Sequence, residues 1–401
     1  MKIVVAGAGI GGLAAALALA RTGHAVDVVE RAPALGEVGA GLQLSPNAVK
    51  VLRQLGVGEP IEAAASHPAS LELRLGRSGR RVFSIPMGAA AVARYGAPYL
   101  HLHRADLLDI LRQAAERAGV QLKLGSEVAA YEGRGNKVFV SLTGGARIEA
   151  DLLVGADGIR SIIREQMLGK DSPRFTGSVA WRLLTPASAA PDLPRGAIVW
   201  AGPRRHAVTY RIRGDAWINF VGVIEESGER QASGSESWDE QGELETLHQA
   251  FAGWADPLPA IIASGGVCRR WPLFDRDPLS RWVDGRVVLL GDACHPLAPF
   301  QAQGAAMAIE DAFMLARCLD ERAGAPEAAL LRYQTLRRPR TDRMLASARA
   351  NMAIFHPSNP LTQAATYGPM MLADRLWPAI ICSAQDWIYG YDVTGQTSVV
   401  G

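Results

Sequence analysis

The sequence predicts an α/β protein, α+β overall, in which a Rossmann-like domain is interrupted by an antiparallel β-sheet domain and followed by a C-terminal helical segment. Three observations support this prediction. A strand, a glycine turn and a helix begin the chain; alternating apolar and polar residues dominate from about Phe175 to Trp271; and a buried-type strand with a long helix returns at Arg286. The 401 residues, 48% hydrophobic and 20% charged, have a globular composition that excludes disorder, collagen and coiled coil.

The N-terminal part of the chain has the periodicity of βαβ units. Lys2–Ala6 is predicted as a strand, a helix runs from about Gly11 to Thr22, and Ala25–Glu30 supplies the β-branched run of a buried parallel strand. The same patterns predict helices at 47–55 and 105–118, strands at 121–124 and 152–155, and a hairpin of 138–142 with 147–151.

The middle of the chain has the alternating pattern typical of antiparallel strands. Alternation predicts strands at 197–200, 207–212 and 216–224. The acidic stretch Glu225–Glu245 is predicted as a solvated loop that leads into a helix at Leu244–Ala255. This part of the chain is therefore expected to form a sheet of its own rather than further βαβ units.

The continuous apolar run typical of a buried parallel strand occurs again toward the C-terminus. Arg286–Leu290 is expected to be a buried strand, Gly304–Leu319 a long helix, and the chain after Pro326 helical, with the arginines at 332–343 on a solvated helix face. These changes divide the chain into a Rossmann-like domain of 1–70, 100–174 and 276–345, a β-rich domain of 71–99 and 175–275, and a helical segment of 346–401.

Charge and cysteine usage exclude several classes of protein. Lys and Arg number 42 against 40 Asp and Glu, a net charge of +2 that is too balanced for a nucleic-acid binder. The four cysteines form no Cys-x-x-Cys pair, so we expect neither zinc nor a redox dithiol, and reduced thiols in a cytoplasm fit best. Ile3–Ala20 is uncharged and mostly apolar, but its glycines interrupt any hydrophobic helix, so neither export nor membrane insertion is expected.

The first glycine turn predicts a phosphate site. Residues 7–12 (GAGIGG) fit G-x-G-x-x-G between a strand and a helix, where the helix N-terminus meets a pyrophosphate. Gly7 makes the tight turn, Gly9 gives the phosphate access, and Gly12 brings helix against strand. Glu30 ends the second strand, where a carboxylate accepts hydrogen bonds from an unphosphorylated ribose diol, as in FAD or NAD.

Two further motifs follow in a fixed order. Gly155–Gly158 continues into Ser161 and Arg164 as D-G-x-x-S-x-x-R, and 291–296 (GDACHP) continues into 302–312 (AQGAAMAIEDA). With the glycine turn and the ending at 386–392, these motifs give nearly the whole chain a resemblance to the FAD-dependent aromatic hydroxylases. These single-component flavoprotein monooxygenases include salicylate hydroxylase, 3-hydroxybenzoate 6-hydroxylase and 6-hydroxynicotinate 3-monooxygenase.

The resemblance implies a reaction. In this family NAD(P)H reduces FAD, dioxygen adds at flavin C4a, and the hydroperoxide hydroxylates a small aromatic or N-heteroaromatic acid of the phenol type, with or without loss of the carboxylate. We expect NADH rather than NADPH, as in relatives with a similar C-terminal ending. The substrate, the ring position and the choice between monomer and homodimer stay open, and no metal ion is expected.

The residues expected at FAD follow from motif chemistry and from the resemblance. Asp292 follows a strand end, where it accepts from a ribityl hydroxyl, and the helix at Gly304 points its positive end toward an anionic reduced flavin. The full set is Gly7, Gly9, Ile10, Gly12, Glu30, Arg31, Gln43, Arg104, Val128, Asp157, Asp292, Gln303, Gly304 and Ala305. The structural alternatives are a cap for Asp292, an ordinary turn for Asp157 and a solvated helix start for Arg104.

His206 and Tyr210 are the candidate catalytic residues. They lie four apart on an alternating strand and so share a face, with the spacing of the His and Tyr that hydroxybenzoate and hydroxynicotinate relatives place over the substrate ring. His206 has the pKa range of a general base, while the alternative is a packed core pair. The substrate pocket is expected to include Cys294, Pro299 and Phe300. Gln43 and Cys294 point to different subgroups of relatives, so they leave the substrate open.

Other functions on this fold remain as alternatives. A flavin-dependent halogenase or reductase would share the cofactor motifs, although the W-x-W-x-I-P run of halogenases does not occur. A non-catalytic flavin-binding protein would also keep the glycine turn. A Ser/His/Asp hydrolase around His295 is disfavoured, because the sequence has no G-x-S-x-G run.

Overall fold

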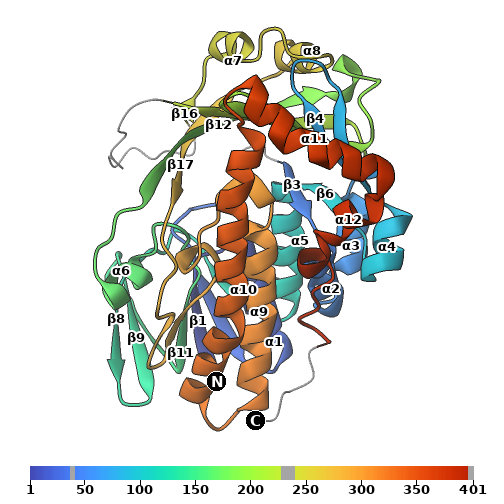
Figure 1. Cartoon of the computed structure of the whole chain (residues 1–401). Helices are drawn as coiled ribbons and strands as arrows, with labels where there is room; N and C mark the ends of the chain where they lie inside the picture. Colours follow the sequence, from blue (N-terminus) through green and yellow to red (C-terminus); the bar gives the residue numbers. More distant parts are fainter. Residues whose placement is uncertain (37–40, 227–239, 396–401) are drawn as a thin grey trace.

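The protein is described here by a computed structural model that covers residues 1–36, 41–226 and 240–395 (Figure 1). A parallel sheet with α1 (Ile10–Arg21) and α9 (Gly304–Glu321) occupies one half, and a second sheet with α7 (Leu244–Ala250) and α8 (Leu258–Ala263) occupies the other (Figure 1). The long helix α10 (Pro326–Phe355) lies beside α9 and extends toward the second sheet (Figure 1). The mixed α/β fold class that the sequence predicts is confirmed.

The first sheet carries the glycine turn. Within the described residues it has six strands in the order β18-β19-β11-β1-β2-β7, and all of its pairs are parallel except β18 with β19. The strands are β1 (Lys2–Ala6), β2 (Ala25–Val29), β7 (Gln121–Lys123), β11 (Leu152–Gly155), β18 (Val283–Asp284) and β19 (Val287–Leu289). The apolar runs are explained by burial, since Ile3, Val4 and Val5 are fully covered on both faces.

The second sheet forms a wall between two environments. Its strand order in the described residues is β16-β17-β12-β15-β14-β13-β4-β5. The strands are β4 (Ser70–Leu75), β5 (Arg81–Pro86), β12 (Arg174–Pro186), β13 (Gly196–Gly202), β14 (Arg205–Ile212), β15 (Trp217–Glu225), β16 (Glu240–Gln241) and β17 (Arg269–Asp275). One face packs Trp200 and Phe220 against α7 and α8, and the other face presents His206, Val208 and Tyr210 to a cavity. The alternation in the sequence reflects these two faces.

Smaller elements complete the two halves. The hairpin strands are β8 (Val128–Arg134), β9 (Lys137–Leu142) and β10 (Arg147–Ala150), and β3 (Gly41–Leu44) pairs with β6 (Leu100–His103). The other helices are α2 (Pro46–Gln54), α3 (Gly58–Ala64), α4 (Ala89–Tyr95), α5 (Arg104–Arg117), α6 (Ile162–Leu168), α11 (Pro360–Leu376), α12 (Pro378–Ser383) and α13 (Asp386–Tyr389). Among the described helices, none has the length and apolar character needed to span a bilayer.

Two local predictions differ from the structure. The helix predicted at Leu244–Ala255 ends at Ala250, because Gly253 adopts a φ of 72° and Trp254 turns back to pack its ring 4.9 Å from that of Phe251. The loop predicted at Glu225–Glu245 is also partly wrong, since β15 reaches Glu225 and β16 begins at 240. Its central part, 227–239, lies outside the described residues.

The arginine cluster at 332–343 is not uniformly solvated, contrary to the prediction. Arg337 is fully buried, and its guanidinium lies 2.7 Å from both Glu310 and Asp311 of α9. Arg340, which is nearly buried, lies 2.7 Å from Glu310. Burial alone would raise the pKa of Glu310, but these two guanidiniums hold it below its ordinary value. The sequence pattern missed this because the acidic partners lie on a different helix.

We predict that Arg337→Met destabilises the fold while its neighbour Arg338→Met does not. Removing the Arg337 guanidinium leaves two buried carboxylates with one partner fewer, which costs about 3–5 kcal/mol in comparable sites. Arg338 is 42% exposed, and its loss is expected to change stability by no more than about 0.5 kcal/mol. Chemical denaturation of both variants measures the difference. Equal stabilities would contradict the role assigned to the buried pairs.

Candidate active site

The glycine turn leaves one position open to a ligand. A Cβ on Gly7, whose φ is 100°, would lie 2.4 Å from the carbonyl oxygen of Ala156, and a Cβ on Gly12 would lie 1.9 Å from that of Gly7. A Cβ on Gly9 would meet no atom within 4 Å. The fold therefore requires Gly7 and Gly12, while the space at Gly9 is available to a phosphate group at the N-terminus of α1.

Glu30, which directly follows β2, is held in a fixed orientation. Its two carboxylate oxygens accept hydrogen bonds from the backbone N–H groups of Ala8 (2.7 Å) and Ala32 (2.9 Å). Each oxygen keeps a second lone pair for a ribose hydroxyl. Arg31 follows on the surface, and Ser126 N donates to Glu30 O (2.8 Å), which brings the start of β8 at Val128 near the same end of the site.

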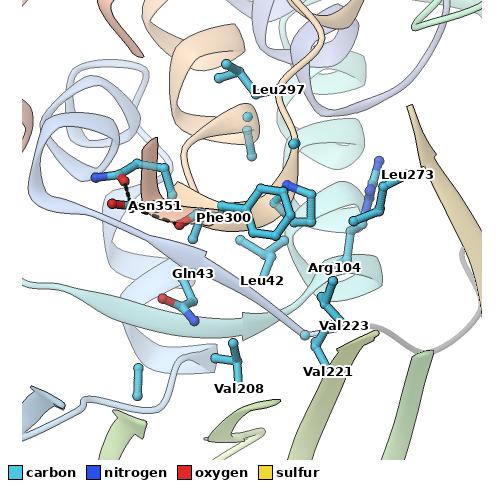
Figure 2. A pocket seen from close by; sticks show the side chains of 18 of the residues that line it. Leu42, Gln43, Arg104, Val208, Val221, Val223, Leu273, Leu297, Phe300 and Asn351 are labelled. Carbon is cyan, nitrogen blue, oxygen red and sulfur yellow. Dashed lines mark hydrogen bonds between the residues drawn. The ribbon is translucent and has the colours of Figure 1, made fainter. Parts of the chain in front are cut away.

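A cavity of about 470 Å³ lies between the two halves of the molecule. Gly9 and Ile10 line it on the side of the first sheet, and the cavity-facing side chains of β14 line it on the side of the second. The side chains of Leu42, Val223 and Phe300 gather around the same space in Figure 2. The cavity is therefore continuous from the phosphate end to the candidate catalytic strand.

Charged groups and a helix N-terminus gather where the first half borders the cavity. Gly304 and Ala305 begin α9 there, so the positive end of the helix dipole faces the space. Asp292 is open to the cavity and otherwise enclosed; burial raises its pKa, and the nearby charges of His295 and Arg104 partly offset that effect. Arg104 lines the same region at the start of α5.

Two of the expected cofactor residues act on the cavity through neighbours. Gln303 is buried, and its side chain donates to Ser45 Oγ (2.9 Å) and accepts from Asn47 (3.2 Å), so it fixes the start of α9. Asp157 accepts from Ile163 N (3.3 Å), while the neighbouring Gly158 lines the cavity. Neither Gln303 nor Asp157 lines the cavity itself.

The D-G-x-x-S-x-x-R motif holds the wall of the cavity together. Ser161 caps α6 by accepting from Arg164 N (2.9 Å), and the buried Arg164 side chain donates to Ile159 O (2.9 Å) and Ala293 O (3.4 Å). The motif therefore ties the loop at 156–161 to the loop that carries Asp292.

Gln43 lies on β3, at the junction of the two halves. It lines the cavity and accepts a hydrogen bond from the Tyr99 hydroxyl (2.7 Å). Gly39 and Ala40, which precede this strand in the predicted glycine-rich run, lie outside the described residues.

The candidate catalytic residues occupy different ends of one strand face. His206 lies beside Phe300, with ring centroids 5.7 Å apart, and Tyr210 lies beside His101 at 4.7 Å. At about 3.3 Å per residue their Cα atoms are about 13 Å apart. Burial lowers the pKa of His206 well below its ordinary value, so the imidazole is neutral, and burial raises that of Tyr210. Both line the cavity, but from opposite ends of the strand.

Of the three residues expected in the substrate pocket, two line the cavity. Pro299 and Phe300 do so from a short 3₁₀ turn at Pro299–Gln301. Cys294 does not; it is buried with its thiol directed at Gly291 O (3.3 Å), next to His295 and Asp311. The carboxylate of Asp311 already accepts from His295, Arg337 and Gly291 N, so this cluster is a hydrogen-bond network of the fold.

Several residues that line or contact the cavity were not predicted from the sequence. Arg182 of β12 lines the cavity and stacks on Trp271 at 4.3 Å; an arginine within the apolar run of this strand was the available signal. His356, at the end of α10, contacts His206, and nothing local in the sequence indicates this. Tyr389 of α13 also lines the cavity, consistent with the ending at 386–392 that the sequence singled out.

The fold and site define a dinucleotide-binding protein with a mainly apolar cavity between its two halves, and the comparisons identify the family. The family model of the FAD binding domain matches residues 1–348, so the chain belongs to this family. The chain is 39% identical over 364 residues to 3-amino-4-hydroxybenzoate 2-monooxygenase of Streptomyces cremeus, covering 90% of this chain and 89% of that protein. It is 36% identical over 405 residues to 6-hydroxynicotinate 3-monooxygenase of Bordetella bronchiseptica, covering 100% and 97%.

Solved structures agree with this assignment. The structure of Klebsiella pneumoniae HpxO complexed with FAD and uric acid superposes with a TM-score of 0.83 at 28% identity, covering 96% of both chains. A salicylate hydroxylase substrate complex superposes with a TM-score of 0.82 at 25% identity, covering 98% of this chain and 96% of that one. The chain is a flavoprotein monooxygenase, and the expectations of its family, its enzyme class and FAD are confirmed.

We predict that Gly9→Val folds but does not retain FAD. Gly9 has a φ of −70°, which any residue adopts, and its Cβ meets no protein atom, so the valine would occupy only the space of the ligand. Flavin absorbance after desalting and thermal unfolding of the apoprotein measure the two effects. The control Gly12→Val is expected to lose both FAD and the fold, because the added Cβ would collide with the backbone of Gly7. Stoichiometric FAD in Gly9→Val would refute the placement of the phosphate.

Proposed function

We propose that this monooxygenase hydroxylates a small aromatic or N-heteroaromatic acid that carries a ring hydroxyl, with NAD(P)H as the electron donor. The observation that carries the proposal is the cavity itself, where an apolar space has a cation, Arg182, and an imidazole, His206, on one wall. Relatives named for hydroxybenzoate and hydroxynicotinate substrates support the class of substrate. Ring position and loss of the carboxylate are left to product analysis.

Arg182 supports an acidic substrate. It projects from β12 beside Trp271, and its charge acts on Tyr210, so it shares the sheet wall of the cavity with the candidate catalytic residues. A guanidinium presents a planar donor fork that matches a carboxylate. The surrounding wall is apolar, with Val199, Val208 and Val221 among the lining residues, and suits an aromatic ring.

The first half of the molecule supplies the cofactor site. We assign all the residues that the sequence predicted for FAD to this role, with Gln303 and Asp157 acting as supports of the wall. When bound, FAD supplies the redox chemistry, taking electrons from NAD(P)H and activating dioxygen. The N-terminus of α9 and Arg104 would stabilise negative charge on the flavin, and the apolar walls would exclude water. We also propose the domain boundaries inferred from the sequence.

The alternative functions are weaker. Relatives across the whole chain are named monooxygenases and hydroxylases, which argues against a non-catalytic flavin protein. A halogenase or reductase has no feature of this site in its favour. The choice between monomer and homodimer stays open, and sedimentation velocity decides it.

The function is tested by purifying the FAD-loaded enzyme and measuring NADH oxidation with hydroxybenzoates, 6-hydroxynicotinate and 3-amino-4-hydroxybenzoate. At least one acid is expected to stimulate NADH oxidation and to yield a hydroxylated product, and its neutral amide is expected to bind more weakly because it offers Arg182 no charge. We expect higher catalytic efficiency with NADH than with NADPH. An absence of stimulation by every hydroxylated aromatic acid would reject the proposal.

Variants of His206 and Tyr210 separate catalysis from packing. His206→Ala and Tyr210→Phe are expected to retain FAD, because neither side chain lies in a flavin motif. If these residues activate the ring hydroxyl, hydroxylation falls by about 10²–10⁴-fold while hydrogen peroxide replaces product. A packing role predicts instead a lower melting temperature, less FAD and unchanged coupling of NADH use to product. Near wild-type rates and coupling in both variants would show that the pair is structural.

A further inference from the structure

A chain of three titratable side chains leads from the cavity toward the surface. His206 Nδ1 lies 2.7 Å from His356 Nε2, and His356 Nδ1 lies 2.8 Å from Glu225 Oε1. His206 and His356 are 2% and 7% exposed, while the Glu225 side chain is 29% exposed. The three residues come from β14, the end of α10 and the end of β15, so the tertiary fold alone brings them together.

The carboxylate end determines how the protons are placed. An ionised Glu225 only accepts, so His356 Nδ1 carries the hydrogen of that bond and its Nε2 is the acceptor for His206. His206 Nδ1 therefore donates, and the lone pair of its ring is on Nε2. Within the described residues Nε2 makes no hydrogen bond, and the ring lines the cavity. The chain thus presents a basic nitrogen to the cavity.

Burial makes a single histidine a poor final acceptor at this position. Desolvation and the neighbouring His356 lower the pKa of His206, so a proton held there as imidazolium is disfavoured. Desolvation also lowers the pKa of His356, although Glu225 partly offsets it. The charged groups facing the outer end are Arg205, which acts on His356, and Arg204, whose Nε lies 3.2 Å from Glu225 Oε2.

We propose that His206, His356 and Glu225 form a proton relay that carries the proton of the substrate's ring hydroxyl out of the cavity. The substrate O–H bond breaks and its electron pair stays on oxygen, while the proton binds His206 Nε2. The Nδ1 proton of His206 passes to His356 Nε2, and the Nδ1 proton of His356 passes to Glu225, which releases it to water. Both imidazoles end neutral, so the substrate oxygen gains its charge without leaving a cation in the cavity.

This inference rests on the proposed function, because it requires a hydroxylated aromatic substrate. His356 and Glu225 act through His206 and are positioning and transfer residues, since neither is among those that line the cavity. Two aromatic side chains cover the relay on the cavity side. One is Phe355, whose ring centroid lies 5.1 Å from that of His206, and the other is Phe300. They separate its outer members from the substrate.

The test compares His356→Gln and Glu225→Gln with the control Arg204→Gln, which touches Glu225 from outside the chain of hydrogen bonds. Oxidised, FAD-loaded enzyme is mixed with 3-hydroxybenzoate, 6-hydroxynicotinate or 3-amino-4-hydroxybenzoate in weak buffer. Flavin absorbance reports binding and a pH indicator reports proton release. We expect His356→Gln to bind normally but to release the proton, and to hydroxylate, about 10²-fold more slowly near pH 7. Arg204→Gln is expected to match the wild type.

The pH profile distinguishes a relay from a structural role. The defect of His356→Gln is expected to shrink as the pH approaches the phenol pKa of about 10, because the substrate then arrives ionised. Added imidazole is expected to restore part of the rate to His356→Ala. A defect equal at every pH, or proton release at the wild-type rate in His356→Gln, would overturn the relay. If none of the acids perturbs the flavin or stimulates NADH oxidation in the wild type, the proposed function itself fails.

Discussion

The buried ion pairs between α9 and α10 are the constraint on which the site depends. Glu310 and Asp311 lie on α9, only two turns from the residues that begin the helix at the cavity, and they are fully buried. Buried carboxylates must be paired, and here Arg337 and Arg340 supply the charge. Any displacement of α9 would therefore break several charge-assisted hydrogen bonds together. The position of the helix N-terminus is accordingly well defined.

The same carboxylates connect α9 to other parts of the cavity wall. Glu310 accepts from Asn47 of α2 (2.6 Å), whose neighbour Ser45 follows the strand that carries Gln43. Asp311 accepts from His295 and from Gly291 N, and these residues flank Asp292. Two adjacent acids thus hold three segments of the cofactor side in one arrangement. This arrangement accounts for the acidic pair within the AQGAAMAIEDA run better than direct contact with a ligand does, because neither acid lines the cavity.

The sequence predicted what depends on local pattern and left out what depends on tertiary contact. The βαβ unit with its glycine turn and the face shared by His206 and Tyr210 follow from spacing along one segment, and the structure contains both. The burial of Arg337 was not predicted, because the pattern of charges along one helix indicates only pairs within that helix. The partners of Arg337 lie on α9. Cys294 was expected in the pocket from its place in the GDACHP motif and the resemblance to relatives, but the backbone of its turn directs the thiol to Gly291 O. The contact of His356 with His206 joins residues 150 positions apart.

One helix connects the two halves of the site. Arg337 and Arg340 of α10 hold α9 at the cavity wall. Asn351 donates to Phe300 O (3.1 Å) and so holds the turn at Pro299–Gln301 (Figure 2). His356, which follows the last residue of the helix, contacts His206. From Arg337 to His356 the helix advances about 28 Å at 1.5 Å per residue. Because one continuous helix carries these contacts, the part of the cavity wall at α9, the turn at Phe300 and the candidate base His206 are all linked to a single element. Oxygen transfer depends on such a linkage, because the aromatic ring of the substrate and the flavin must be held in a fixed relative position. Errors of about 1 Å in that position cost large factors in rate.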